Sequence, residues 1–475
     1  MFQNLKRLGG DSLLYALMNV GTKMIAFIML PIYTNFLSPT EYAPVDIIDR
    51  WTAMLVFLVI LGTDSALAFY YFEKKDEKDK RSYIQSVMNI RLFMVLCLFL
   101  IILIIGPLFA NELLQSDQGL YWLYLSIGVL FLDTISALIL TVMRYEFHTI
   151  KVVVLTVLKM LLVAVLSYLF LKFFVRSVEG ILYGRIISGA LIVLLLAKPL
   201  IKFISFKIDR DVLRDLLKYG LPLVPASLAF WIILNSSSFF LAFMKSAEEV
   251  GIYGAATKFA ALITLVTSGI QMAWRPYSMS LKDKPNNKEL FSKVYIIILL
   301  MGATGVLVVA TIMPYVILLL DEAYYSAYQY VALLSAATFL NFYYLIISVG
   351  IFFMKKTKII SYAFAGAAVI NVILNIILIP SYSIWGVVAS YLISYLAAII
   401  YIFVKSQKLY YIPVSLWKMS ALFFVMLAGT IGIVYVQEHA LSPLYIVLAW
   451  VVYVATVGIT RVDKDLRGTR NHETN

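Results

Sequence analysis

Charge, cysteine and histidine are scarce in this chain of 475 residues. Only 14% of the residues are charged, against about 25% in a typical soluble domain, and 62% are hydrophobic. The single cysteine, Cys97, excludes an intrachain disulfide and a cysteine metal site. The three histidines lie far apart along the chain, at His148, His439 and His472, and predict no metal cluster. We therefore expect a polytopic membrane protein that binds no metal and no cofactor.

Catalytic patterns are also missing. The sequence has no Gly-rich phosphate loop of the P-loop type and no evident pair of nucleophile and base, so it predicts neither ATP-driven transport nor an enzyme. The formal net charge of +12 suggests nucleic acid at first sight. The cations, however, are spread over loops that would face anionic lipid, which favours the membrane surface as their partner and no nucleic acid.

Lys and Arg avoid every second loop. Fourteen apolar stretches are each long enough to cross a bilayer core of about 30 Å. The gaps on the side of the N-terminus hold 29 cations, and the opposite gaps hold three, Lys172, Arg176 and Lys245. The positive-inside rule then puts both termini in the cytoplasm. We expect a multi-pass protein of a bacterial or archaeal cytoplasmic membrane.

The expected architecture is all-α, with about fourteen transmembrane helices. The expected spans are 11–37, 44–72, 82–109, 120–143, 151–172, 179–198, 219–244, 250–278, 290–320, 325–350, 359–379, 381–404, 414–436 and 442–460. The charged segment 202–218 has helical periodicity and indicates an amphipathic helix on the cytoplasmic surface. We expect a six-helix lobe at 1–200, this linker at 201–218, a second six-helix lobe at 219–408, and two further helices with a cytoplasmic tail at 409–475.

The two lobes resemble each other at a shift of 208 residues. This shift superimposes Ser38 on Ser246, Glu41 on Glu249, and Arg50 on Lys258. It also carries whole spans onto spans of the same orientation, as a parallel repeat about the membrane normal requires. Such a repeat predicts a central cleft between two bundles.

Several motifs resemble polysaccharide flippases of the multidrug/oligosaccharidyl-lipid/polysaccharide (MOP) exporter superfamily. They follow one another in the expected order: LPIYTNFLSPTEYA (30–43), GTDSALAFYYFE (62–73), KYGLPLVPASLAFWI (218–232), VGIYGAATKFA (250–260), FMKKTKII (353–360) and IPSYSIWGVVASYLISYL (379–396). The resemblance implies alternating access between two lobes and export of polyprenyl-diphosphate-linked sugars. The chain departs from the family at Phe69, where an Arg is usual, and at Ser238 and Phe239, where Asp-Arg is usual.

Seven cations fall inside expected spans, where a charge costs about 2.5–3.5 kcal/mol on insertion scales. Lys23 lies near the middle of the first span, and Arg50 and Lys258 occupy equivalent places in spans 2 and 8. With Arg185, these are the candidate cavity cations that would bind a diphosphate. Near the cytoplasmic ends of their spans we expect three cations that snorkel to the surface: Arg91, Lys159 and Lys418.

Acids and amides inside the spans are fewer. Asp64 and Asp133 either bind a coupling proton or sodium ion, or pair with a cation such as Lys23. Asp46 and Asp49 are expected to be solvated near the outer mouth. Three asparagines lie in the spans, where they either bond neighbouring helices or line a sugar path: Asn235 and the pair Asn371 and Asn375, which are four residues apart and share a face.

The best-supported function is a flippase for polyprenyl-diphosphate-linked oligosaccharide, which moves its substrate from the inner to the outer leaflet for cell-surface polysaccharide synthesis. Its expected partners are that glycan, membrane lipid and, in the pathway, glycosyltransferases or a polysaccharide polymerase. An ion-coupled drug or metabolite exporter of the same superfamily is the first alternative, and it would favour acids over cations in the cavity. A non-transporting membrane scaffold is the second, and it gives no reason for a charge such as Lys23 in mid-membrane.

Overall fold

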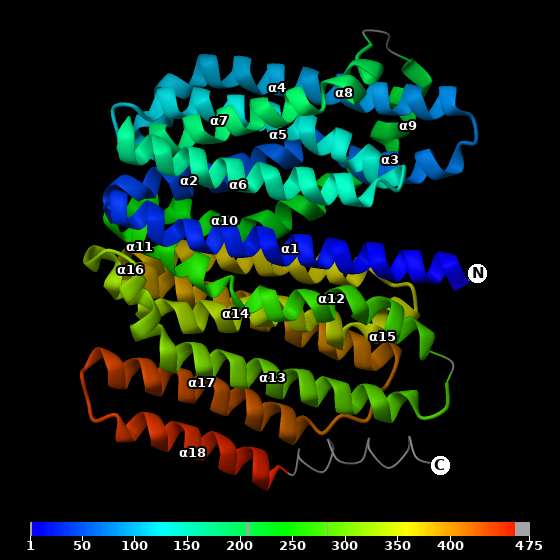
Figure 1. Cartoon of the computed structure of the whole chain (residues 1–475). Helices are drawn as coiled ribbons and strands as arrows, with labels where there is room; N and C mark the ends of the chain where they lie inside the picture. The colour runs from blue at the N-terminus through cyan, green and yellow to red at the C-terminus, as the bar shows by residue number, and fades with distance from the viewer. Residues whose placement is uncertain (1, 206–208, 283, 461–475) are drawn as a thin grey trace. The chain divides into compact units, whose positions relative to one another are not determined.

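A computed structural model describes residues 2–205, 209–282 and 284–460, and Figure 1 shows its long helices. Within these ranges the ordered elements are α-helices with three short 3₁₀ turns, and there is no strand. The α-helices are α1 (Phe2–Phe36), α2 (Pro39–Ile60), α3 (Thr63–Glu73), α4 (Glu77–Leu113), α5 (Gly119–Tyr145), α6 (Thr149–Phe173), α7 (Val178–Leu195), α8 (Ala197–Phe203), α9 (Arg210–Gly220), α10 (Val224–Met244), α11 (Ala247–Ala260), α12 (Ile263–Ser280), α13 (Asn287–Val316), α14 (Tyr328–Ile347), α15 (Val349–Phe353), α16 (Lys358–Leu409), α17 (Leu416–Glu438) and α18 (Leu444–Ile459).

Ten helices of the described ranges are long and apolar enough to cross a membrane, and the number rises to twelve if each bent pair is one span. The bent pairs are α2 with α3, at 40°, and α11 with α12, at 45°. Helix α16 contains a non-helical residue at Ser383 (φ 49°, ψ −127°), so it consists of two helices that match the two expected spans there. Helix α18 is apolar but has only 16 residues. The all-α polytopic membrane class is confirmed, and the number fourteen stays a prediction.

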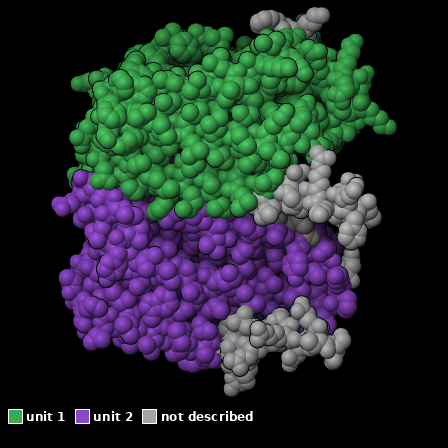
Figure 2. Space-filling model, in the orientation of Figure 1, with its two compact units in different colours: residues 1–251 green, residues 252–475 purple. Residues whose placement is uncertain are grey.

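The chain divides into two compact units, residues 1–251 and 252–475, coloured separately in Figure 2. The first unit extends beyond the linker expected at 201–218, because α10 packs against α2 and α4 of that unit. The division into repeat lobes at 201–218 stays a prediction.

The expected amphipathic segment covers the end of α8 and most of α9, with residues 206–208 outside the described part of the chain. Asp209 caps α9 by accepting hydrogen bonds from the backbone N–H groups of Asp211 and Val212. The apolar side of α9 packs against α3 and α4, where Leu216 is completely buried. The amphipathic pattern therefore serves, at least on this side, to attach α9 to the core of the first unit.

The repeat is visible in the way α2 and α11 begin. The backbone N–H of Ser38 donates to Glu41 Oε2 at 2.8 Å, and that of Ser246 donates to Glu249 Oε2 at 3.2 Å. In return, the hydroxyls of Ser38 and Ser246 accept from the glutamate N–H groups, at 3.4 and 3.3 Å. Both helices thus start with the same capping box, as the shift of 208 residues predicts.

The two copies differ farther along. Helix α2 has 22 residues before its break, whereas α11 has 14. Lys258 therefore lies in the last turn of α11, while Arg50 lies in the interior of α2. Arg50 and Lys258 lie equally far from the starts of their helices, as expected. Their positions relative to the helix break differ, so the expectation of equivalent places is wrong in that respect.

Candidate functional site

Four ion pairs involve cations expected inside the spans of the first unit; three of them connect two helices, and the pair of Asp46 and Arg50 lies within α2. They join Asp46 to Arg50, Asp49 to Arg185, Asp64 to Arg91, and Asp133 to Lys159. Four of the seven cations expected inside spans therefore have a carboxylate partner. This pairing removes much of the cost of placing charge in a low-dielectric region, provided that the geometry is good.

Arg50 lies between α2 and α10. Its Nε is 2.6 Å from Asp46 Oδ2, and its Nη1 donates to the carbonyl of Leu234 at 3.2 Å. The hydroxyl of Ser238 donates to the same Asp46 oxygen at 2.8 Å. Asp46 is 1% exposed and Arg50 is 7% exposed, so the expectation of a solvated Asp46 is wrong. The helix geometry explains this result, because residues four apart share one face of α2.

Arg185 of α7 pairs with Asp49 of α2, with 2.6 Å between Nη1 and Oδ1. Both side chains keep partial access, at 20% and 25% exposure. Asp49 is therefore a paired group, and it is not simply solvated as expected. Unlike Arg50, Arg185 retains a surface on which a second anion could bind.

Arg91 of α4 is buried to 1% exposure and does not snorkel to the surface, so that expectation is wrong. Its Nη2 pairs with Asp64 Oδ1 of α3, and its Nη1 donates to the carbonyl of Thr134 in α5 at 2.9 Å. Asp64 itself is 44% exposed. A buried guanidinium thus holds three helices together, and its partner carboxylate is accessible on one side.

Lys159 of α6 forms a similar ion pair with Asp133 of α5, the residue that precedes Thr134. Its Nζ is 2.6 Å from Asp133 Oδ1 and 3.4 Å from the hydroxyl of Ser136. Lys159 is 19% exposed and Asp133 is 45% exposed. Lys159 is therefore paired, whereas we expected it to snorkel. Asp64 and Asp133 do have cation partners, which is one of the two expected roles, and these partners are Arg91 and Lys159.

The three remaining cations lie on different helices. Lys23 is half-buried on α1, and Lys258 is half-buried in the last turn of α11. Lys418 is half-buried in the first turn of α17, next to the cap residue Ser415. This place at the start of a helix fits the snorkelling expected for Lys418.

The amide residues divide into two groups. Asn371 and Asn375 are completely buried, and Nδ2 of Asn375 donates to Oδ1 of Asn371 at 3.1 Å, so they share a face as expected. Asn235 donates to the carbonyl of Trp231 one turn earlier in α10, at 3.3 Å. Among the residues that the structure describes, no group of His, Cys, Asp or Glu side chains could hold a metal ion.

The residue Phe69, where the superfamily resemblance predicts an Arg, lies in an aromatic cluster. Its ring stacks on Tyr219 of α9, with centroids 5.4 Å apart and an interplanar angle of 23°. Nearby, the hydroxyl of Tyr83 donates to Asp215 at 3.0 Å. The aromatic pair at Phe69 thus attaches α3 to α9, a contact between helices that no local sequence pattern indicates.

Comparison with known families now adds to this geometry. Residues 8–282 match the family model described as polysaccharide biosynthesis protein. The match covers more than half of the chain. The chain belongs to the polysaccharide biosynthesis protein family. No curated protein sequence matches it significantly.

Solved structures show the same fold in this family member. The lipid II flippase MurJ in an inward closed conformation matches with a TM-score of 0.72 at 14% identity, over 95% of this chain and 99% of that chain. An inward-facing MATE family multidrug transporter of the MOP superfamily matches with a TM-score of 0.65 at 17% identity, over 85% of this chain and 96% of that chain. An outward-facing MATE structure matches with a TM-score of 0.55 at 18% identity, over 87% of this chain and 96% of that chain. The polysaccharide family that the sequence resembles is confirmed by the family model, and the solved structures confirm the expected fold.

Proposed function

We propose that this family member is a flippase that carries a polyprenyl-diphosphate-linked oligosaccharide from the inner to the outer leaflet by alternating access. The observation that carries the proposal is the family match, because polysaccharide biosynthesis requires lipid-linked sugars to cross the membrane. The fold supports it, since a flippase of a lipid-linked cell-wall precursor aligns along nearly the whole chain.

The extent of the structural match favours a flippase over a drug exporter. The MATE structures leave a larger part of this chain uncovered than the lipid II flippase does. Helices α17 and α18 pack on each other, and α17 packs against α13 and α14 of the second unit. We propose that this additional apolar surface accompanies the prenyl tail while the headgroup crosses.

The diphosphate needs cations that can form new contacts. Lys23 and Lys258 are half-buried, and Arg185 keeps a fifth of its side-chain surface exposed beside Asp49. We assign these three to the diphosphate, because ammonium and guanidinium groups form strong charge-assisted hydrogen bonds with phosphate oxygens. Arg50 is almost fully buried against Asp46, so we assign it the role of positioning α10 against α2.

The ion-coupled exporter is the second candidate, and a specific observation favours it. Asp64 and Asp133 are each nearly half exposed, while their cation partners are more deeply buried. Accessible carboxylates can bind a proton or sodium ion, and four acids pair with four of the five cations expected inside the spans of the first unit. An excess of cations over acids therefore does not by itself separate the two transport functions, and a direct test is needed.

The test is reconstitution of the purified protein in vesicles with a fluorescent polyprenyl-diphosphate sugar in the inner leaflet. Wild-type protein should expose the sugar to an external lectin, and a Lys23→Gln, Lys258→Gln double variant should lose most of this activity while remaining folded. Lys202→Gln, which changes an exposed lysine of α8, serves as the control. Full activity of the double variant would contradict the assigned cation roles. Transport of cationic drugs without transport of the lipid-linked sugar would support the exporter.

The remaining partners follow from the pathway. Glycosyltransferases would supply the lipid-linked sugar on the inner leaflet, and a polymerase would consume it on the outer leaflet. Genes for such enzymes beside the gene of this protein would support the flippase. A non-transporting membrane scaffold would expose no sugar to the lectin even as the wild-type protein, so the same reconstitution tests that alternative as well.

A further inference from the structure

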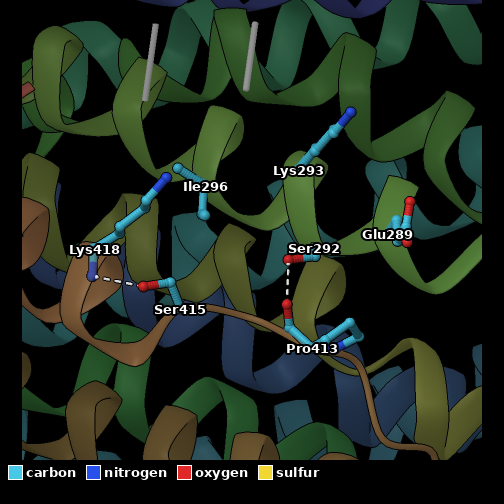
Figure 3. Close-up of a pocket in the computed structure, with 7 residues that line it drawn as sticks. All are labelled: Glu289, Ser292, Lys293, Ile296, Pro413, Ser415 and Lys418. Carbon is cyan, nitrogen blue, oxygen red and sulfur yellow. Dashed lines mark hydrogen bonds between the residues drawn. The ribbon is translucent and has the colours of Figure 1, made fainter. Parts of the chain in front are cut away.

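A small basic pocket lies at one end of the second unit, between α13 and the segment that leads into α17. Its volume is about 260 Å³, and Figure 3 shows the residues that line it. Helix α13 contributes Glu289, Ser292 and Lys293, and the other wall consists of Pro413, Ser415 and Lys418. None of these residues takes part in the ion pairs of the first unit.

The pocket has a fixed wall. The hydroxyl of Ser292 donates to the carbonyl of Pro413 at 2.7 Å, and that of Tyr410 donates to Asn287 Oδ1 at 2.9 Å. The ammonium of Lys288 lies 5.2 Å from the centroid of the Tyr410 ring. The segment before α17 is thereby fastened to the first turns of α13. The two pocket lysines consequently project from rigid elements.

The charges of the pocket favour a singly charged anion. Lys293 and Lys418 are half-buried and Glu289 is exposed, which leaves a net charge of one positive unit. In the view of Figure 3, Lys418 and Lys293 lie on the two sides of Ile296, and Glu289 lies beyond Lys293. Helices α13 and α17 both begin here, so their N-terminal dipoles add to the positive potential.

An apolar trough continues from this pocket along the same helices. Leu299 lines the trough on α13, three residues after Ile296 of the pocket, so both lie on one helix face. On α17, Leu416 and Met419 of the trough directly follow Ser415 and Lys418 of the pocket. The trough has a volume of about 270 Å³ and is lined mainly by apolar side chains of α13, α14, α16 and α17.

We propose that this pocket and trough bind an anionic phospholipid of the membrane. Its phosphodiester would lie between Lys293 and Lys418, and part of an acyl chain would fill the trough. Basic pockets between transmembrane helices are known to hold anionic headgroups. A phosphodiester carries one negative charge, which matches the net charge of the pocket, whereas the diphosphate of the transported substrate carries more. The apolar trough favours a lipid over free phosphate.

The test uses the full chain in nanodiscs that contain either phosphatidylglycerol or phosphatidylcholine, with bound lipid counted by native mass spectrometry. Wild-type protein should retain phosphatidylglycerol in preference to phosphatidylcholine. Lys293→Gln and Lys418→Gln should each weaken the retention about fivefold, because one cation near an anionic surface contributes about that factor. Lys293→Arg should preserve it. Ser420→Trp, which fills the trough without a change of charge, should also weaken it.

The matched control is the double variant Lys358→Gln, Lys408→Gln, which removes two exposed lysines of α16, a helix of the trough wall, outside the pocket. Retention that falls equally in this control would overturn the proposal, because it would indicate general surface attraction. Displacement of the lipid by inorganic phosphate alone, or at equal concentration by a polyprenyl diphosphate, would also overturn it. The assay measures binding without transport, so its failure leaves the proposed flippase function untouched.

Discussion

Gly62 and Gly220 lie backbone against backbone in the first unit. A Cβ on Gly62 would overlap the carbonyl of Gly220, and a Cβ on Gly220 would overlap the carbonyl of Leu61. Gly62 has φ +71° and marks the break between α2 and α3, while Gly220 ends α9 just before the turn into α10. The bend in the second span is therefore in direct contact with the end of the linker helix.

This contact predicts that either glycine resists substitution by alanine. Gly62→Ala adds a left-handed backbone penalty of about 1–2 kcal/mol to the overlap. Gly220→Ala tests the overlap alone, because the φ of Gly220 is −80°. Both variants should lower the melting temperature in detergent. Gly305→Ala in α13, where a Cβ meets no atom within 4 Å, should leave it unchanged or raise it slightly. Equal melting temperatures for all three variants would contradict the close approach.

The repeat and the helix starts could be predicted because their determinants are local. Ser38 with Glu41, and Ser246 with Glu249, form capping boxes whose spacing is visible in the sequence. The pair Asn371 and Asn375 follows equally from the helical period. The membrane class could be predicted from the length of the apolar stretches and from the charges of the loops, because each of these properties is read from one segment of the chain at a time.

The ion pairs could not be predicted in the same way. Asp64 and Arg91 are 27 residues apart, and which span faces which is decided by helix packing that no local pattern records. Snorkelling was the wrong expectation for Arg91 because its carboxylate partner lies on another helix, where no local sequence pattern indicates the contact. The Asp46 and Arg50 pair is the exception, since its spacing of four residues places both side chains on one helix face and is visible in the sequence.

The asymmetric burial of the Asp64 and Arg91 pair predicts unequal costs for its two halves. Asp64→Ala leaves a guanidinium that is 1% exposed without its carboxylate, which should cost about 3–5 kcal/mol. Arg91→Met leaves a carboxylate with 44% exposure and should cost less. The double variant should be more stable than Asp64→Ala alone. Thermal unfolding in detergent measures these differences.

A control for this prediction is Asp133→Ala, which leaves the more accessible Lys159, at 19% exposure. It should destabilise the protein less than Asp64→Ala. If Asp64 also binds a coupling ion, the stable double variant should fold and yet lose export driven by an ion gradient. A double variant that is less stable than both single variants would show that Arg91 and Asp64 do not compensate each other.

The orientation expected from the loop charges is testable with cysteines at exposed positions. In a Cys97→Ser background, an impermeant thiol reagent on intact cells should label Asp117→Cys and Ser442→Cys, and it should not label Glu77→Cys or Lys284→Cys. All four positions are exposed in the structure. Gln437 is a poorer choice, because its side chain is part-buried and donates to the carbonyl of Ala310. Labelling of Glu77→Cys in intact cells would reverse the orientation.

Ser238 supplies the last prediction, because its hydroxyl donates to a carboxylate that is almost fully buried. Ser238→Ala removes one charge-assisted hydrogen bond from Asp46 and should cost about 1.5–3 kcal/mol. Ser188→Ala is the matched control, since Ser188 is equally buried but bonds only to the carbonyl of Gly184 on its own helix, and it should cost less.

Ser238→Asp restores the acid that the superfamily resemblance predicts here, but it places a second carboxylate beside Asp46 with one guanidinium between them. Like charges at this distance oppose ionisation of both groups. The aspartate variant should therefore be the least stable of the three, because two carboxylates share one guanidinium. A melting temperature for Ser238→Asp equal to that of the wild-type protein would contradict the buried Asp46 and Arg50 arrangement.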